Sequence, residues 1–246
     1  MNQTEEDCIV LNYGDERLRA FGESGIRPQV IWFSGTEELE NGYYLKDDVL
    51  YKAVNGKAEK LLCTDEVLLV GQCNYENILA AAAITEAMGV PQDTVLNTIR
   101  SFHAVPHRIE YVKTVKGVRY YNDSKGTNPD AAIQGIKAMT GKTYLIGGGY
   151  DKGSTYDEWI EMFGDKVRKL ILMGVTREKI AACARAHGFT DIVFVESMEE
   201  AVNLAYAEAL PGEAVLLSPA CASWGMFDNY EQRGDIFKDL VRGLKE

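Results

Sequence analysis

The 246-residue sequence contains no apolar run of the ~18 residues that a membrane-spanning helix needs. Its five cysteines are scattered, and none forms a C-x-x-C pair. Its three histidines lack the spacing of metal ligands. We therefore expect neither a disulfide framework nor a metal site, and scattered thiols suit the reducing cytoplasm. These residues are Cys8, Cys63, Cys73, Cys183, Cys221, His103, His107 and His187.

Positive charge is scarce: 26 Lys and Arg stand against 37 Asp and Glu, for a net charge of −11. This balance argues against a nucleic-acid or anionic-membrane partner. Most of the excess negative charge precedes residue 108, so the second part tolerates local positive sites such as Arg108, Lys125 and Lys152. We expect a phosphate or carboxylate ligand to meet this second part.

From residue 106 onward, apolar strand-like runs alternate with helical patterns. This alternation predicts βαβ units and a doubly wound, mostly parallel α/β sheet covered on both faces. A hairpin is expected at Lys116-Gly117, and Thr176 and Ser197 are expected helix N-caps. The predicted strands are 109–115, 118–121, 143–146, 169–173, 192–195 and 214–217, and the predicted helices are 129–139, 155–163, 176–187, 198–209 and 228–244.

Residues 1–105 do not show this regular strand–helix alternation and are expected to form a separate domain. Asn41-Gly42 and Asn55-Gly56 each lie between strand-like runs, which is a strong hairpin signal. Two helices should follow, one after Gly71 and one that Pro91 starts. The predicted strands are 8–11, 29–34, 43–45, 49–54, 58–63 and 67–70. A short helix at 16–21 is predicted between the first two strands.

The turn at 122–127, Asn-Asp-Ser-Lys-Gly-Thr, is the main candidate for chemistry. It leads from a strand into a helix that Asn128 caps and Pro129 starts. Ligands of a parallel sheet bind beyond the carboxyl ends of its strands, and helix N-termini favour anions. The alternative is an ordinary polar loop whose Asp and Asn only cap the helix.

Two further loops are expected at the same sheet edge. In 147–153, Gly-Gly-Gly-Tyr-Asp-Lys-Gly, the glycines permit close approach of a ligand and Lys152 supplies a charge. It is neither G-x-G-x-x-G nor a Walker A loop. The loop 218–227 carries small residues and hydroxyls that suit a carboxylate, or tight packing alone. Cys221 has no partnered histidine in the sequence, so we do not expect it to be a nucleophile.

In the first part, Asn74 and Asn77 are three residues apart at the start of a helix, so they share a face. Asn74 could simply be the N-cap. Asn77 is harder to explain in this way, because Asn is a mediocre helix former.

Four strings resemble the Mur ligases, and in particular the members that add D-glutamate. They are H-R-I-E-Y-V (107–112), Y-N-D-S-K-G-T-N-P-D-A (121–131), G-G-G-Y-D-K-G (147–153) and L-S-P-A-C-A-S-W-G-M-F-D-N-Y-E-Q-R-G-D-x-F (217–237). Leu11-Asn12 and residues 71–77 also resemble the central domain of that family, so the resemblance covers nearly the whole chain. Cys73 departs from the family, which more often has histidine there.

The resemblance implies a cytoplasmic, ATP-dependent enzyme of peptidoglycan precursor synthesis that works through an acyl phosphate. It implies ATP and Mg²⁺ as cofactors, and UDP-N-acetylmuramoyl-L-alanine and D-glutamate as substrates. Residues 1–105 would be the latter part of the central ATP-binding domain, and 106–246 the Rossmann-like C-terminal domain. The family's N-terminal domain, phosphate loop, modified lysine and main magnesium ligands are not in this sequence, so we expect the chain alone to be inactive and to need the missing part.

Residue roles follow from the same resemblance, position by position. Asn74 and Asn77 would contact the nucleotide, with Asn77 at the adenine. Arg108 would reach the ATP phosphates from the domain junction, Asp123 would contact the ribose, and Lys125 would lie near the transferred phosphoryl group. The D-glutamate pocket would consist of Thr127, Lys152, Ser223 and Tyr230.

Three alternatives remain open from the sequence. One is a different amino-acid-adding Mur ligase. Another is a non-catalytic nucleotide- or ligand-binding module, because half of the family's active site is missing. The third is a dinucleotide-dependent oxidoreductase using the loop 147–153, against which the late third glycine counts.

Overall fold

The computed structural model describes residues 3–246. The chain divides into two compact units, the first ending at His103 and the second beginning at Ala104. The boundary expected from the sequence lay between residues 105 and 106. Within residues 3–246, no helix combines the length and the apolar character needed to cross a bilayer. Each unit is described below by itself.

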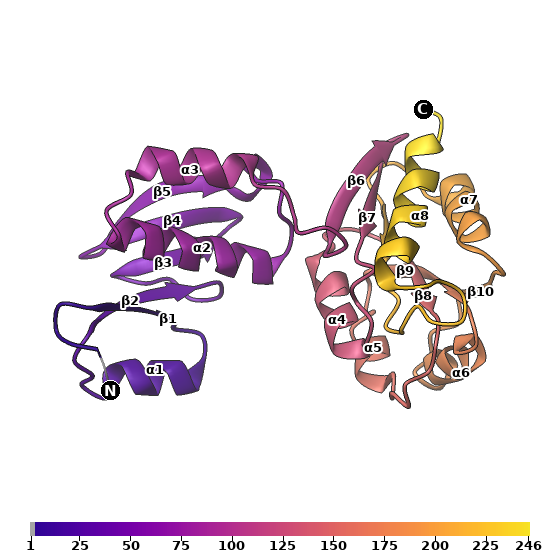
Figure 1. The fold of residues 1–246 in the computed structure, drawn as a ribbon, viewed down its shortest axis with the longest axis horizontal. Coiled ribbons are helices and arrows are strands. Elements are labelled where there is room, and N and C mark those ends of the chain that lie inside the picture. The colour runs from indigo at the N-terminus through magenta and orange to yellow at the C-terminus, as the bar shows by residue number, and fades with distance from the viewer. Residues whose placement is uncertain (1–2) are drawn as a thin grey trace. The chain divides into compact units, whose positions relative to one another are not determined.

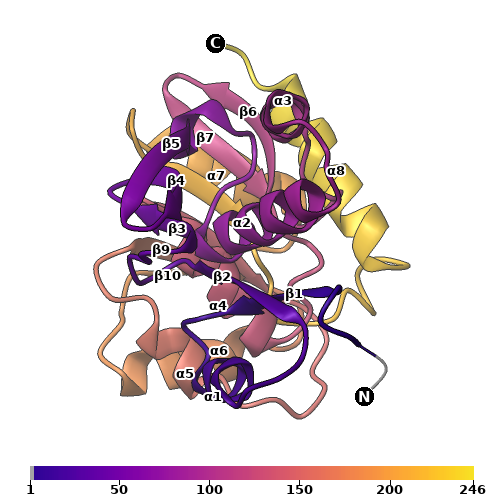
Figure 2. The same ribbon diagram turned by 90° about the vertical axis from the view of Figure 1, so that its left-hand side faces the viewer.

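The first unit is a five-stranded sheet with the strand order β1-β2-β3-β4-β5, in which the first three strands are parallel and the last two join antiparallel. Helix α2 packs on β1, β2 and β3, and α3 packs on α2 (Figures 1 and 2). The elements are β1 (Cys8–Asn12), α1 (Glu16–Glu23), β2 (Gln29–Ser34), β3 (Gly42–Lys46), β4 (Val49–Val54), β5 (Lys57–Cys63), the 3₁₀ turn η1 (Thr64–Glu66), α2 (Gln72–Ala87) and α3 (Gln92–Ser101).

Two predictions for this unit are wrong. Asn41-Gly42 is not a hairpin turn, because β2 and β3 run parallel with Phe33 opposite Tyr43. The hairpin between β3 and β4 instead turns at Asp47 and Asp48, whose φ angles are 48° and 59°. The hairpin at Asn55-Gly56 is confirmed, with positive φ at both residues.

Residues 67–70 do not form the predicted strand. After β5 the chain turns through η1 and leaves the sheet toward α2. Val67 is buried in the core of this unit, and Leu69 packs against it. The apolar character of the segment therefore reflects a buried connection, which the sequence pattern does not distinguish from a short strand.

The second unit is a six-stranded sheet with the order β10-β9-β8-β11-β7-β6, parallel except for the edge strand β6. The predicted doubly wound α/β fold is confirmed. The elements are β6 (Glu110–Val115), β7 (Val118–Asn122), α4 (Pro129–Ala138), β8 (Thr143–Gly148), α5 (Asp157–Glu161), β9 (Val167–Met173), α6 (Arg177–Ala186), β10 (Ile192–Phe194), α7 (Met198–Glu208), β11 (Ala214–Leu217) and α8 (Tyr230–Gly243).

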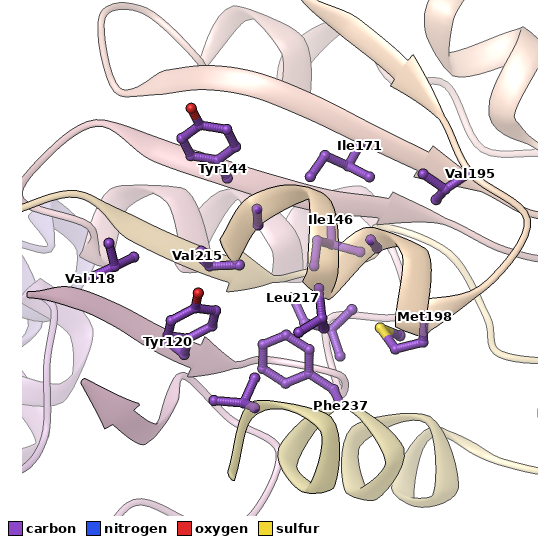
Figure 3. Packing of buried hydrophobic residues seen from close by; sticks show 14 of the residues in the cluster. Val118, Tyr120, Tyr144, Ile146, Ile171, Val195, Met198, Val215, Leu217 and Phe237 are labelled. Atoms are coloured by element: carbon purple, nitrogen blue, oxygen red, sulfur yellow. The ribbon is translucent and has the colours of Figure 1, made fainter. Parts of the chain in front are cut away.

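Helices cover both faces of this sheet. On one face α7 and α8 pack on the strands, where Phe237 of α8 and Met198 of α7 lie against Val215, Leu217 and other strand residues (Figure 3). On the other face α6 contacts β8 and β9, and α5 lies between α4 and α6. Both faces of the central strands are buried, which is why these strands read as continuous apolar runs.

The second unit should fold without the first, because it contains a complete sheet with helices on both sides. A fragment comprising residues 104–246 is expected to give a near-UV circular dichroism spectrum with fixed aromatic bands and a cooperative urea transition. A fragment with helical far-UV dichroism but no near-UV bands would contradict the assignment of residues 104–246 as an independent domain.

Candidate functional site

Three loops meet at one edge of the sheet in the second unit. They follow β7, β8 and β11, which are neighbours in the order β8-β11-β7 and run parallel. The carboxyl ends of these strands therefore lie side by side. This edge is where a parallel sheet binds ligands.

Asp123, in the loop after β7, is an internal bridge. Its side chain is buried, and its two carboxylate oxygens accept hydrogen bonds from the Ser218 hydroxyl (2.7 Å) and from the Ile109 backbone N–H (3.3 Å). Burial raises the pKa of Asp123 to about 7, against the opposing effects of these hydrogen bonds and of the Arg108 and Arg233 charges. The carboxylate thus ties the loops after β7 and β11 to the start of β6.

Arg233 on α8 is the strongest tie among these loops, and no role was predicted for it from the sequence. Its guanidinium is 1% exposed. It donates to the Ser124 hydroxyl (2.9 Å), the Ser124 carbonyl (2.7 Å) and the Cys221 carbonyl (3.0 Å). Burial lowers the pKa of Arg233 to about 10, so the group remains charged at neutral pH. One side chain therefore fixes the loop after β7 to the loop after β11.

His107 anchors the segment before β6. It has a φ of 67°, its ring Nδ1 lies 3.0 Å from Asn122 Nδ2, and its backbone N–H donates to Glu110 (2.9 Å). A Cβ at residue 234 would lie 2.2 Å from His107 Nδ1, so the glycine of α8 makes room for the ring. Burial lowers the pKa of His107, which favours the neutral ring. Arg108, which follows His107 and precedes Ile109, is exposed.

Lys125 and Tyr230 come together, although the sequence analysis assigned them to different ligands. The Lys125 ammonium donates to the Tyr230 hydroxyl at 3.0 Å and lies 4.9 Å from the centre of its ring. The ring of His107 packs edge-on against Tyr230 at 5.8 Å between centroids. Thr127 is half-buried in the same loop, and its backbone N–H donates to the Lys125 carbonyl at 2.8 Å.

The loop after β8 is held against the loop after β11. The backbone N–H groups of Gly148 and Tyr150 donate to the carbonyls of Pro219 and Ala222, each at 2.9 Å. A Cβ on Gly149, whose φ is 147°, would come within 2.3 Å of the Ala222 carbonyl oxygen. Gly148 and Gly149 therefore allow close approach of backbone to backbone.

This contact brings Lys152 to the neighbourhood of Ser223. The exposed Lys152 ammonium lies 5.1 Å from the ring centre of Trp224, and Ser223, the preceding residue, is 4% exposed. Tyr150 also packs edge-on against Trp224 at 5.6 Å. Lys152 and Ser223 therefore come from two loops that are held side by side.

Thr176 is the N-cap of α6, as the sequence predicts, but its side chain makes no capping hydrogen bond. Its hydroxyl instead accepts from the Gly149 N–H (3.0 Å) and donates to the Gly149 carbonyl (3.1 Å). Thr176 is fully buried and also lies 3.4 Å from the Cys221 sulfur. The buried Cys221, whose pKa is raised chiefly by burial, packs in this network beside Tyr156. Both observations agree with a structural thiol.

The Ser197 cap is confirmed, with the Glu200 N–H donating to its hydroxyl.

The remaining candidates, Asn74 and Asn77, lie in the first unit on α2. Asn74 is not the N-cap, since that position is Gly71; its amide donates to the Val70 carbonyl at 2.8 Å. Asn77 is exposed and lines a largely apolar pocket of about 400 Å³ between α2 and α3, together with Phe102.

Replacing Arg233 by Lys should destabilise the second unit by roughly 2–4 kcal/mol, because a single nitrogen cannot occupy the three positions from which Nε, Nη1 and Nη2 reach their separate buried acceptors. Urea denaturation of the variant measures this change. The control is Arg242→Lys on the same helix, where an exposed guanidinium lies 3.5 Å from Asp239, and which should change stability by less than about 0.5 kcal/mol. Equal effects of the two substitutions would contradict the bridging role.

The buried carboxyl of Asp123 should make stability fall with rising pH. Its pKa is about 7 in the folded protein against a usual 3.8, so the folded state holds the proton more tightly and loses this advantage as the pH rises from about 4 to 7. Relative to Asp123→Asn, the wild type should lose up to about 4 kcal/mol over that range. Parallel stability–pH curves for the two proteins would contradict this assignment.

The comparisons with known proteins agree with one another. Residues 107–221 match the family model described as "Mur ligase, glutamate ligase domain". The chain is 51% identical over its whole length to a UDP-N-acetylmuramoylalanine–D-glutamate ligase of Lachnoclostridium phytofermentans, and 49% identical over 99% of its length to one of Lachnospira eligens. It covers 54% of each of these proteins, so the chain spans about half the length of the curated relatives it matches.

Solved structures of Mur ligases share the fold at low sequence identity. MurC from Thermotoga maritima matches with a TM-score of 0.63 and 16% identity, over 97% of this chain and 52% of that one. Thermotoga maritima MurF in complex with ADP matches with a TM-score of 0.58 and 17% identity, over 96% and 54% respectively. By sequence motifs and relatives, residues 107–221 are similar to the glutamate ligase domain of the Mur ligases, and the chain as a whole is similar to about half the length of the D-glutamate ligases it matches.

Proposed function

We propose that this chain serves an ATP-dependent amide ligase that adds D-glutamate to UDP-N-acetylmuramoyl-L-alanine in the cytoplasm, as a step of peptidoglycan precursor synthesis. The supporting observation is the placement of Lys125 and Lys152 on loops that Arg233, Asp123 and Gly149 hold together at one sheet edge. Two fixed cations at this edge suit a reaction between a phosphoryl donor and a dicarboxylate. The partners are these small molecules, with no nucleic acid or membrane.

The reaction proceeds in two steps. The γ-phosphoryl group of ATP passes to the carboxylate of the UDP-linked alanine, which forms an acyl phosphate and ADP. The amine of D-glutamate then attacks the acyl carbon, and phosphate leaves from the tetrahedral intermediate to give the amide. Negative charge builds up on phosphoryl and carbonyl oxygens, so fixed cations stabilise the transition states more than a protein nucleophile could.

Lys125 takes the catalytic role beside the transferred phosphoryl group. Tyr230 accepts a hydrogen bond from the ammonium and lies against it, which limits the orientations that the lysine can adopt. Two of the three ammonium hydrogens remain for phosphoryl oxygens. We assign Arg108 to the ATP phosphates, since this exposed residue lies in the chain between the buried residues His107 and Ile109.

D-glutamate binding is assigned to Lys152, Thr127 and Ser223, with Tyr230 contributing beside Lys125. The two carboxylates of the amino acid need charged or hydroxyl donors, and the amine must remain free to attack. Trp224 lies beside the Lys152 ammonium and gives this cation an apolar support. A charge-assisted hydrogen bond from Lys152 is worth roughly 1.5–3 kcal/mol.

The nucleotide contacts are assigned to Asn74, Asn77, Arg108 and Asp123. For Asp123 a ribose contact must compete with Ser218 and Ile109, which already occupy both of its carboxylate oxygens. For the same reason, the described residues of this edge do not form a ligand set for Mg²⁺, which prefers free carboxylate oxygens. The magnesium ion of the ATP complex would take its protein ligands from elsewhere.

The direct test joins this chain to the preceding part of the Lachnoclostridium phytofermentans relative. The fused protein should release phosphate from ATP only when UDP-N-acetylmuramoyl-L-alanine and D-glutamate are both present, and Lys125→Ala should abolish this activity. Phosphate release that needs a different amino acid would indicate another member of the family. A fused protein that folds and binds ATP but forms no amide would favour a non-catalytic binding module.

In that fused protein, Lys152→Ala should raise the apparent KM for D-glutamate by about ten- to a hundredfold and leave that for ATP nearly unchanged. Ser223→Ala should have a smaller effect in the same direction. The matched control is Lys137→Ala, which removes an exposed ammonium from α4. A defect in ATP saturation with normal D-glutamate saturation would place Lys152 at the nucleotide instead.

A further inference from the structure

A group of metal-ligating side chains lies where α5 contacts α6, and none of them belongs to the three loops. Asp157 and Glu161 are four residues apart on α5. Cys183 and His187 are four residues apart at the end of α6, where His187 is the C-cap. Residues four apart on a helix share a face, so each helix presents a pair of potential ligands.

The two pairs meet. The ligand atoms of Asp157, Cys183 and His187 all lie within 4.8 Å of one another. The Cys183 sulfur lies 3.6 Å from Asp157 Oδ1, and His187 Nε2 lies 2.9 Å from the same oxygen. No movement of a helix is needed to place one ion among these three atoms, because each lies at the end of a side chain that can rotate.

These separations fit a tetrahedral zinc ion. Zinc bonds of about 2.3 Å to sulfur and about 2.0–2.2 Å to nitrogen or oxygen place neighbouring ligand atoms about 3.3–3.7 Å apart. The Cys183–Asp157 separation already falls in this range. The His187–Asp157 pair, now at hydrogen-bond distance, needs to open by less than about 1 Å. Calcium and magnesium are disfavoured, because a thiolate and an imidazole are poor ligands for them.

Glu161 supplies the support that a zinc-bound histidine usually has. One of its oxygens lies 3.8 Å from His187 Nδ1, on the side of the ring opposite to Asp157. A metal at Nε2 requires the ring proton at Nδ1, and a carboxylate facing Nδ1–H fixes that tautomer. The side chain of His187 is 27% exposed and that of Asp157 60%, so an ion can enter from solvent.

We propose that Asp157, Cys183 and His187 bind Zn²⁺ in this second unit, with Glu161 orienting the histidine and a water molecule completing the tetrahedron. On binding, the Cys183 thiol gives its proton to solvent and the sulfur becomes a thiolate ligand. The ion ties the start of α5 to the end of α6. The sequence did not indicate this site, because each helix carries only half of the ligands.

The test measures Zn²⁺ affinity of the 246-residue chain by competition with a chromophoric chelator. Cys183→Ser and His187→Gln should each weaken the affinity at least tenfold, and Glu161→Gln about tenfold. Cys63→Ser and His103→Gln, which remove a thiol and an imidazole outside this cluster, should leave it unchanged. With Co²⁺ as the probe, a thiolate-to-cobalt absorption band should appear in the wild type and be lost only in Cys183→Ser.

Circular dichroism establishes that each variant is folded. Should Cys183→Ser fail to fold, Glu161→Gln serves in its place, because Glu161 is largely exposed. Zn²⁺ should also raise the unfolding temperature of the wild type but not that of His187→Gln. The proposal is overturned if the wild type binds no zinc at micromolar concentrations, or if the control substitutions reduce binding as much as the cluster substitutions do.

Discussion

The buried guanidinium of Arg233 is the constraint on which the functional edge of the second unit depends. A charged group that is 1% exposed must have its donors satisfied, and here backbone carbonyls and a hydroxyl satisfy them. Because these acceptors belong to Ser124 and Cys221, satisfying the charge also fixes two loops to α8. Removing the guanidinium would leave buried carbonyls without hydrogen-bond partners. A single substitution of Arg233 would therefore disturb both loops.

Other buried groups extend this framework. Asp123 joins Ser218 to the start of β6, and Thr176 holds Gly149 through both its N–H and its carbonyl. Lys125 and Lys152 project from the loops fixed in this way, each supported by an aromatic ring. A buried polar scaffold that carries the half-buried Lys125 and the exposed Lys152 is the arrangement that the proposed anion site requires.

Much of the second unit could be predicted from the sequence, because its strands are apolar on both faces and its helices carry local start signals such as Asn128-Pro129. The strand order could not, since a strand does not record its neighbours. In the first unit, Asn41-Gly42 misled because the hairpin signal does not reveal that the flanking strands run parallel. The Asp47-Asp48 turn was missed because aspartate is a weaker signal for positive φ than glycine.

In the candidate site, too, the sequence did not record which distant segments are neighbours. The sequence placed Lys125, Lys152 and Ser223 at one sheet edge because βα loops share that edge. It could not show that Tyr230 meets Lys125, or that Arg233 is buried, because both contacts join segments more than a hundred residues apart. The sequence also could not show that Gly148 and Gly149 pack closely against the backbone of Met173 and Ala222.

The central claim is that three loops of the second unit form one carboxylate-binding crevice. Amide NMR spectra of the 104–246 fragment, recorded during titration with D-glutamate, test it most directly. We predict that the signals of residues 125–127, 150–153 and 222–224 shift together with a single apparent affinity, and that L-glutamate produces smaller shifts. Shifts confined to one loop, or shifts that spread elsewhere in the fragment, would contradict the convergence of these loops on one ligand.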